Sequence, residues 1–153
     1  MLIFTLFACT TATDTAETED PAVHACEHAA TSEGSITAGA TMDTTAGALP
    51  IDAEPYTAVL TAGAPGYLAI EVTGDTPALL FLGVADVAAN LYSGAEEVGL
   101  PEGAPNEACA TDIPEHFDLD LHTAGTWYLE LGPAAIDQVW ISLASAEGHA
   151  HEE

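Results

Sequence analysis

Residues 116–131 read HFDLDLHTAGTWYLEL, and this stretch decides the fold class. Apolar and polar residues alternate over His116–His122 and again over Thr126–Leu131, which is the period of a strand with one buried face and one wet face. The loop between them, residues 123–125, ends in glycine, which suits the left-handed position of a three-residue hairpin loop. We therefore predict that the two runs pair as an antiparallel hairpin.

This predicted hairpin opposes Leu119 to Leu129 on its apolar face and Asp118 to Glu130 on its polar face. Like charges directly opposed destabilise a sheet, and Asp120 adds a third carboxylate beside them. A bound Ca²⁺ would relieve the repulsion, because hard cations take oxygen ligands. Hydration and salt screening would relieve it too. Asp118, Asp120 and Glu130 are thus either a cation patch or a solvated face.

The rest of the chain from Gly34 onward has the same texture, with short apolar runs separated by Gly, Pro, Asp and Asn. Strands at such regular spacing are typical of all-β domains. We predict an all-β fold, an antiparallel β-sandwich with a jelly roll among the arrangements that fit, preceded by a short N-terminal helical or irregular segment. The further predicted strands are Ile36–Ala40, Tyr56–Thr61, Tyr67–Thr73, Ala78–Val84, Val87–Tyr92 and Val139–Ala144.

The excess of acidic over basic residues limits the kinds of partner that the protein can bind. The 153 residues include 25 Asp and Glu, six His and no Lys or Arg, for a formal net charge of −25. Nucleic acid is excluded as a partner, because nothing in the chain neutralises phosphate. Anionic lipid headgroups would repel the domain. Metal cations and basic protein partners would be attracted, although an acidic, solvated surface for a salty or extracellular setting also explains this composition.

The first nine residues have the character of a targeting segment. An apolar run, MLIFTLFA, ends at Leu6-Phe7-Ala8-Cys9, which resembles the lipobox of bacterial lipoproteins. The resemblance implies cleavage before Cys9, a lipid on its thiol and a location in the bacterial cell envelope, periplasmic or surface-exposed. No basic residue precedes the run, so either the true start lies upstream of Met1 or the run is an ordinary hydrophobic terminus. The Thr- and acid-rich residues that follow fit a tether.

The predicted organisation is a signal peptide at 1–8, an acidic tether at 9–22, a β-sandwich domain at 23–146 and a His/Glu tail at 147–153. With Cys9 lipidated, Cys26 and Cys109 are left as a pair. In an exported protein such a pair predicts a disulfide. The alternative is that both act as thiolate metal ligands.

Histidines supply the candidate metal site. His24 and His28 would share one face of a helix at i and i+4, with the reach to share a metal ion. His116 lies near Cys109 in sequence, and His149 and His151 sit in the acidic tail; each is a candidate for the remaining ligands. Neutral imidazole favours Zn²⁺, Cu²⁺ or Ni²⁺. The alternative is that these histidines are solvated and incidental.

Two segments, 64–72 (APGYLAIEV) and 123–131 (TAGTWYLEL), look like strand-and-turn elements of the bacterial pre-peptidase C-terminal domain. That resemblance implies a small β-sandwich on a secreted protein and carries over no catalytic residues. The chain contains no nucleophile elbow, zinc-protease motif or phosphate loop. We predict an exported, lipid-anchored protein that binds Zn or Cu, with Ca less favoured, and not an enzyme. The alternative is a non-catalytic adhesion or structural module of the envelope.

Overall fold

The computed structural model describes residues 20–44, 47–52, 54–84 and 87–146. The fold is an all-β sandwich with one short helix, as predicted. The six-stranded sheet has the order β1-β2-β10-β4-β8-β7, and the four-stranded sheet has the order β3-β9-β5-β6. All pairings are antiparallel except that of β1 with β2, which is parallel.

The longer strands follow the predicted runs with shifts of a few residues at their ends, whereas two short strands, β6 (Glu96–Glu97) and β7 (Ala104–Pro105), are not among the predicted runs. The six-stranded sheet is built from β1 (Gly34–Thr37), β2 (Pro55–Val59), β4 (Thr76–Leu82), β7 (Ala104–Pro105), β8 (Glu115–Leu121) and β10 (Gln138–Ser145). The four-stranded sheet is built from β3 (Gly66–Val72), β5 (Ala89–Ser93), β6 (Glu96–Glu97) and β9 (Gly125–Leu131). The helical elements are α1 (Pro21–Glu27) and the 3₁₀ turn η1 (Met42–Thr44).

The predicted hairpin of β8 with β9 is wrong. β8 pairs with β4 and β7, whereas β9 pairs with β3 and β5, so the chain crosses from one sheet to the other at residues 122–124. The alternation is satisfied either way, because leucines of both strands face the core whether the strands are neighbours or face each other across it. Gly125 does have a positive φ of 138°, a conformation that favours glycine.

The core lies between the sheets and is made of the inward-facing residues of both. Burying each large aliphatic side chain stabilises the fold by roughly 1.5–3 kcal/mol relative to an exposed one. The indole of Trp127 is buried among them and donates from Nε1 to the carbonyl of Thr123 at 2.8 Å, which ties down the crossing between sheets. The fully buried members include Leu68, Ile70, Leu80, Leu82, Leu91, Leu121, Leu129, Leu131, Ile141 and Leu143.

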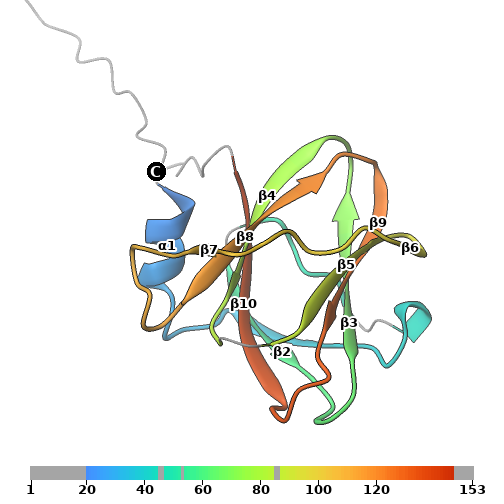
Figure 1. The fold of residues 1–153 in the computed structure, drawn as a ribbon, viewed down its shortest axis with the longest axis horizontal. Helices are drawn as coiled ribbons and strands as arrows, with labels where there is room; N and C mark the ends of the chain where they lie inside the picture. Colours follow the sequence, from blue (N-terminus) through green and yellow to red (C-terminus); the bar gives the residue numbers. More distant parts are fainter. Residues whose placement is uncertain (1–19, 45–46, 53, 85–86, 147–153) are drawn as a thin grey trace, which may run out of the picture.

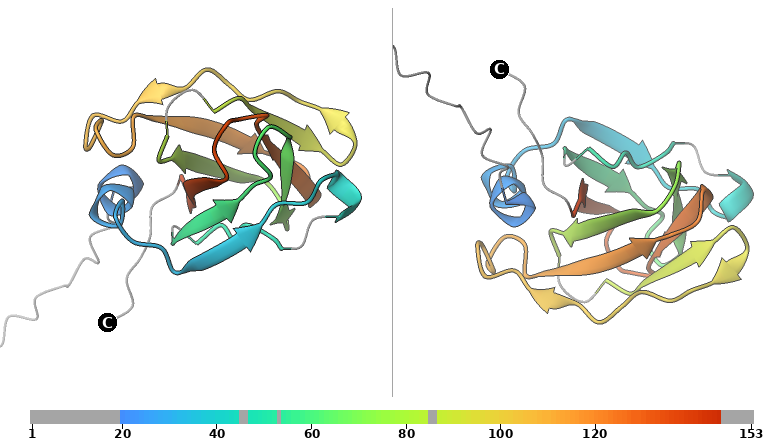
Figure 2. Two further views of the ribbon diagram at one scale, coloured as in Figure 1. Left: turned by 90° about the horizontal axis from the view of Figure 1, so that it is seen from below. Right: turned by 90° about the horizontal axis from the view of Figure 1, so that it is seen from above.

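A second, smaller core lies on the outer face of the six-stranded sheet. Figure 1 shows α1 at one end of the molecule, beside β7, β8 and β10, and β3, β5 and β9 on the other side. In both views of Figure 2 the helix stands outside the two sheets. Ala25 of α1 packs there with Phe81 of β4, Ala144 of β10 and Ile113 of the 106–114 loop. Among the described residues, no helix is long and apolar enough to cross a membrane.

Candidate functional site

The helix α1 is short and is held in place from outside. Asp20 caps its N-terminus by accepting from the amide of Ala22 at 2.9 Å, and Pro21 occupies the first turn, where a missing amide proton is harmless. A helix of seven residues is marginal by itself in water. Its far end is fixed by Trp140 of β10, whose Nε1 donates to the carbonyl of Thr31 at 2.8 Å. The sheet therefore dictates where the helical residues lie.

The Cys26–Cys109 disulfide is the second anchor of the helix, and it confirms the sequence-based prediction. The two Cα atoms are 5.7 Å apart and 83 positions apart in sequence. Because the sulfurs are bonded to each other, neither acts as a thiolate ligand in this structure. The buried amide of Asn106 lies 3.6 and 3.7 Å from the two sulfurs, and its carbonyl accepts from the amide of Ala108. Sequence analysis missed this role of Asn106, because nothing in the local pattern marks it.

His24 and His28 are adjacent on α1. Their ring centroids are 4.7 Å apart with the planes tilted by 42°; His24 is buried and His28 half-buried. The Thr31 hydroxyl donates to the carbonyl of His28 at 3.0 Å and lies 3.5 Å from Nδ1 of the same residue. The two imidazoles therefore lie side by side on one face of the helix.

His116 lies on β8 and faces Phe81, with ring centroids 5.8 Å apart. Its Nδ1 is buried and has no hydrogen-bond partner among the described residues. Within that part of the chain, no group of three or more His, Cys, Asp or Glu side chains is placed to hold a metal. His116 therefore does not join His24 and His28 as a third ligand in this structure. Cys9, His149 and His151 lie outside the described residues.

The predicted carboxylate patch does not exist as such, because it depended on the hairpin. Asp118 is opposite Leu79 and Asp120 is opposite Pro77 in the six-stranded sheet. Glu130 belongs to the other sheet. The calcium prediction depended on Asp118 lying opposite Glu130, and these two residues are in different sheets.

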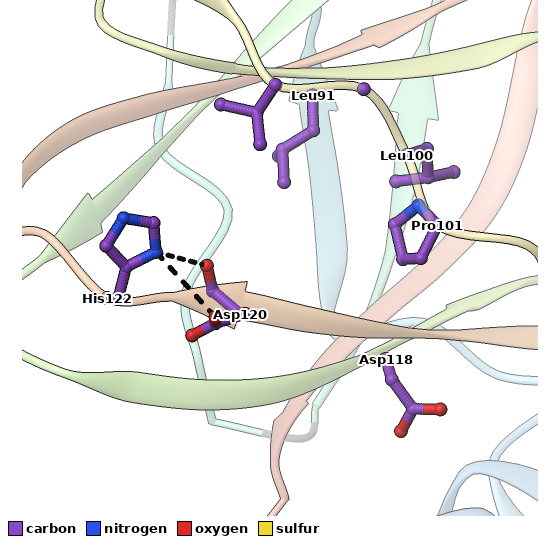
Figure 3. Close-up of a pocket in the computed structure, with 8 residues that line it drawn as sticks. Leu91, Leu100, Pro101, Asp118, Asp120 and His122 are labelled. Carbon is purple, nitrogen blue, oxygen red and sulfur yellow. Dashed lines mark hydrogen bonds and ion pairs between the residues drawn. The ribbon is translucent and has the colours of Figure 1, made fainter.

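The two aspartates instead line a pocket of about 300 Å³ between β8 and the segment 98–101 (Figure 3). Its apolar wall comes from Leu91, Leu100 and Pro101. His122 also lines it, with Nδ1 3.2 Å from the carbonyl and 3.8 Å from a carboxylate oxygen of Asp120. Both of these side chains are largely exposed to solvent, so the pocket is a shallow, wet surface feature.

The outer face of the four-stranded sheet carries a cluster that sequence analysis did not identify. Tyr92 donates to a carboxylate oxygen of Glu130 at 2.7 Å, and Asn90 donates to the Tyr92 hydroxyl at 3.3 Å. The Tyr67 ring stands edge-on to that of Tyr92, with centroids 6.4 Å apart. We call Tyr67, Tyr92, Tyr128, Glu97 and Glu130 the tyrosine–glutamate face. The alternation in β9 marked Tyr128 and Glu130 as outward-facing, but the neighbours come from strands that only the fold brings together.

Glu130 and burial together raise the pKa values of two phenols on this face. Its hydrogen bond and charge, together with burial, raise the pKa of Tyr92 to about 12. Burial raises the pKa of Tyr67, and the charge of Glu130 and a hydrogen bond to it act in the same direction. Both tyrosines therefore remain neutral donors at physiological pH, with their hydroxyls directed at one carboxylate.

Comparison with known proteins adds no family to these observations: no family model matches the chain, and neither does any curated protein.

Proposed function

We propose that this protein is an exported, lipid-anchored binding module of the bacterial cell envelope that holds a divalent transition metal through His24 and His28. The observation that carries the proposal is the pair of adjacent imidazoles on α1, a helix that the Cys26–Cys109 disulfide ties to the domain. Zn²⁺ and Cu²⁺ both accept neutral imidazole. Zn²⁺ is the first choice, because it takes a tetrahedral site with one position left for water or another ligand.

The third ligand in this proposal is a tail histidine. Ala144 packs in the same small cluster as Ala25, so the end of β10 lies at the helix. His149 follows Ala144 by five positions, and an extended chain of that length reaches about 17 Å. The tail also carries carboxylates, which add to the attraction for a cation. His149 or His151 would therefore complete a three-histidine site with His24 and His28.

No catalytic role is proposed. The sequence offers no nucleophile motif, and the disulfide removes both cysteines of the domain from nucleophilic chemistry. The proximity of His24 and His28 on a helix held by a disulfide supports a role as a pair of metal ligands. A metal bound there would be carried or buffered.

The test is calorimetric titration of Zn²⁺ into the full-length, disulfide-bonded protein without a purification tag, in moderate salt at pH 7.5. We expect saturation at one equivalent, with loss of binding in His24→Ala/His28→Ala and weakening in His149→Ala/His151→Ala. His122→Ala is the matched control, since it removes an exposed histidine far from α1, and it should bind as the wild type does. Affinity should fall as pH drops through about 6.5, because protonated imidazole cannot ligate.

Buried His24 could also support the helix, so His28→Ala alone is the second variant. Its side chain is half-buried, and far-ultraviolet circular dichroism should show the fold retained. Non-saturating binding, binding erased by salt, or equal binding in wild type and both histidine variants would reject the site in favour of diffuse attraction to the acidic surface.

The lipid anchor rests on the Leu6-Phe7-Ala8-Cys9 motif and is tested separately. Expressed in a bacterium with its native upstream region, the protein should incorporate a fatty-acid analogue and sediment with membranes. Cys9→Ser should abolish both, while Cys109→Ser should leave labelling intact as the control for replacement of another cysteine. Labelling that persists in Cys9→Ser would reject this anchor.

A non-catalytic adhesion or structural module of the envelope is the second candidate. The observation that favours it is the tyrosine–glutamate face, a half-buried sheet surface rich in side chains suited to protein contacts. A protein that binds no metal in the titration above would leave this as the better account.

A further inference from the structure

The tyrosine–glutamate face is ordered by the strand register of the four-stranded sheet. In one row across it, Ala69 of β3, Tyr128 of β9, Tyr92 of β5 and Glu97 of β6 stand opposite one another. In the next row, Tyr67, Glu130 and Asn90 do the same. Directly opposed residues point to the same side of a sheet, so aromatic rings and carboxylates form one continuous outward surface.

The tyrosines of this surface are half-buried, and the turn η1 contacts β3, the edge strand of the sheet. Helix α1 packs on the other sheet, against β10, and β3, β5 and β9 lie on the side of the molecule away from the helix (Figure 1). β3 is the outermost strand of its sheet. Along its outer edge, Gly39 forms a bridge to Tyr67 and Ala48 forms a bridge to Ala69. These bridges occupy part of that edge, which leaves less of it for an added partner strand.

The charge on the face has no counterpart within the chain. Glu97 and Glu130 flank the tyrosines, and the whole chain lacks Lys and Arg. Glu130 accepts from both Tyr92 and Tyr67, and because a carboxylate has about four lone-pair positions, it retains capacity for a cationic donor. The hydrogen bonds to Glu130 and Asn90 hold the Tyr92 ring in one orientation, which lowers the entropy that a stacked partner would have to remove.

We propose that the Tyr67–Tyr92–Glu130 cluster binds an arginine side chain of a basic partner protein. A guanidinium is planar, stacks on a tyrosine ring and donates two parallel hydrogen bonds to a carboxylate. Lysine presents a point charge and would use only the carboxylate well. This inference is independent of the metal site on α1.

The test uses a blocked peptide in which three arginines alternate with glycine and serine, and its affinity for the full-length protein is measured by fluorescence anisotropy. Glu130→Gln should weaken binding about tenfold, because it removes the charge from a charge-assisted hydrogen bond. Asp118→Asn is the matched control: it makes the same change of charge on an exposed residue of the other sheet, and it should leave the affinity within about twofold, the effect of one screened surface charge.

Tyr92→Leu should also weaken binding, and the matched lysine peptide should bind at least several-fold more weakly than the arginine peptide. Circular dichroism of each variant separates loss of the face from loss of the fold, and zinc binding of Glu130→Gln should be unchanged. Equal weakening by Asp118→Asn and Glu130→Gln would overturn the proposal, since it would reveal diffuse charge attraction. Equal affinity for the two peptides would overturn it as well, as would an uncharged oligosaccharide that binds this face while the arginine peptide does not.

Discussion

The outer faces of the two sheets differ in their residues and in what packs on them. On the outer face of the six-stranded sheet, Phe81, Ser142 and Ala144 are buried, and Phe81 and Ala144 pack with Ala25 of α1 and Ile113 of the disulfide-bonded loop. Asp118 and Asp120, farther along the same face, stay exposed. The four-stranded sheet presents half-buried tyrosines together with glutamates, and α1 packs on the other sheet. Small outward residues leave room for a helix, whereas hydrogen-bonded tyrosines suit a surface that stays in contact with water.

The difference also separates the proposed functions. On the covered face, packing and the disulfide position a short helix and with it the two histidines. On the bare face, hydrogen bonds within the sheet position aromatic rings and carboxylates for a partner. Rigid support of the helix should therefore govern metal binding, while Glu130 should govern recognition of a basic protein.

The largest expected effect is the loss of folding stability when the disulfide that anchors α1 is removed. Cys26→Ser/Cys109→Ser removes a crosslink between residues 83 positions apart, and the chain-entropy relation assigns such a loop about 4–5 kcal/mol of stabilisation. Urea unfolding of the variant and the wild type measures the change in free energy. A loss below about 1 kcal/mol would mean that packing alone holds α1 in place, since it falls far short of the crosslink value.

A substitution beneath the helix compares the two faces directly. Phe81→Ala removes a fully buried ring and should lower the free energy of unfolding by about 3–5 kcal/mol. Tyr128→Ala on the bare face should cost less than about 1 kcal/mol, the contribution of a cross-strand pair. Comparable losses in the two variants, measured by urea unfolding, would contradict the distinction drawn between the faces.

Loss of one anchoring hydrogen bond should lower the free energy of unfolding by less than the two changes above. Trp140→Phe keeps a ring but removes the donor to the carbonyl of Thr31, so we expect a cost of about 0.5–1.5 kcal/mol. Hydrogen exchange should accelerate in residues 24–31 and stay unchanged in β9. Uniform acceleration across both segments would indicate a global effect rather than release of the helix.

The smallest effect at neutral pH concerns the bare face. Tyr92 has its pKa raised from 10.0 to about 12 in the folded protein, so its contribution to stability is fully present below pH 10 and is lost as pH rises through about 12. Glu130→Gln should bring the pKa of Tyr92 down towards 10.0, because it removes the carboxylate that accepts its proton. Carbon-13 NMR of the tyrosine rings follows this titration. A pKa of Tyr92 that is the same in both proteins would show that Glu130 is not its cause.

The strands were predictable from sequence because apolar and polar residues alternate within each of them. The runs at 116–122 and 126–131 are both strands, as predicted, yet their pairing was wrong, because pairing depends on partners far away in the chain. The parallel pairing of β1 with β2 left no local signal either. Alternation identifies the inward side chains but not the strand that lies alongside.

The same reasoning explains what could be foreseen of the sites. Helical spacing predicted that His24 and His28 would be neighbours, and the number of cysteines predicted the disulfide; the structure has both features. The cluster of Tyr67, Tyr92 and Glu130 could not be foreseen, because its residues come from three strands that are neighbours only after folding.

The most direct test of the central claim is a two-dimensional amide NMR titration of the full-length protein with Zn²⁺. If α1 carries the metal site, the shifts at one equivalent should concentrate at and around His24 and His28, with the amides of β3, β5 and β9 unmoved. Shifts spread over the glutamates of the four-stranded sheet, or growing without saturation while α1 stays unchanged, would contradict the account.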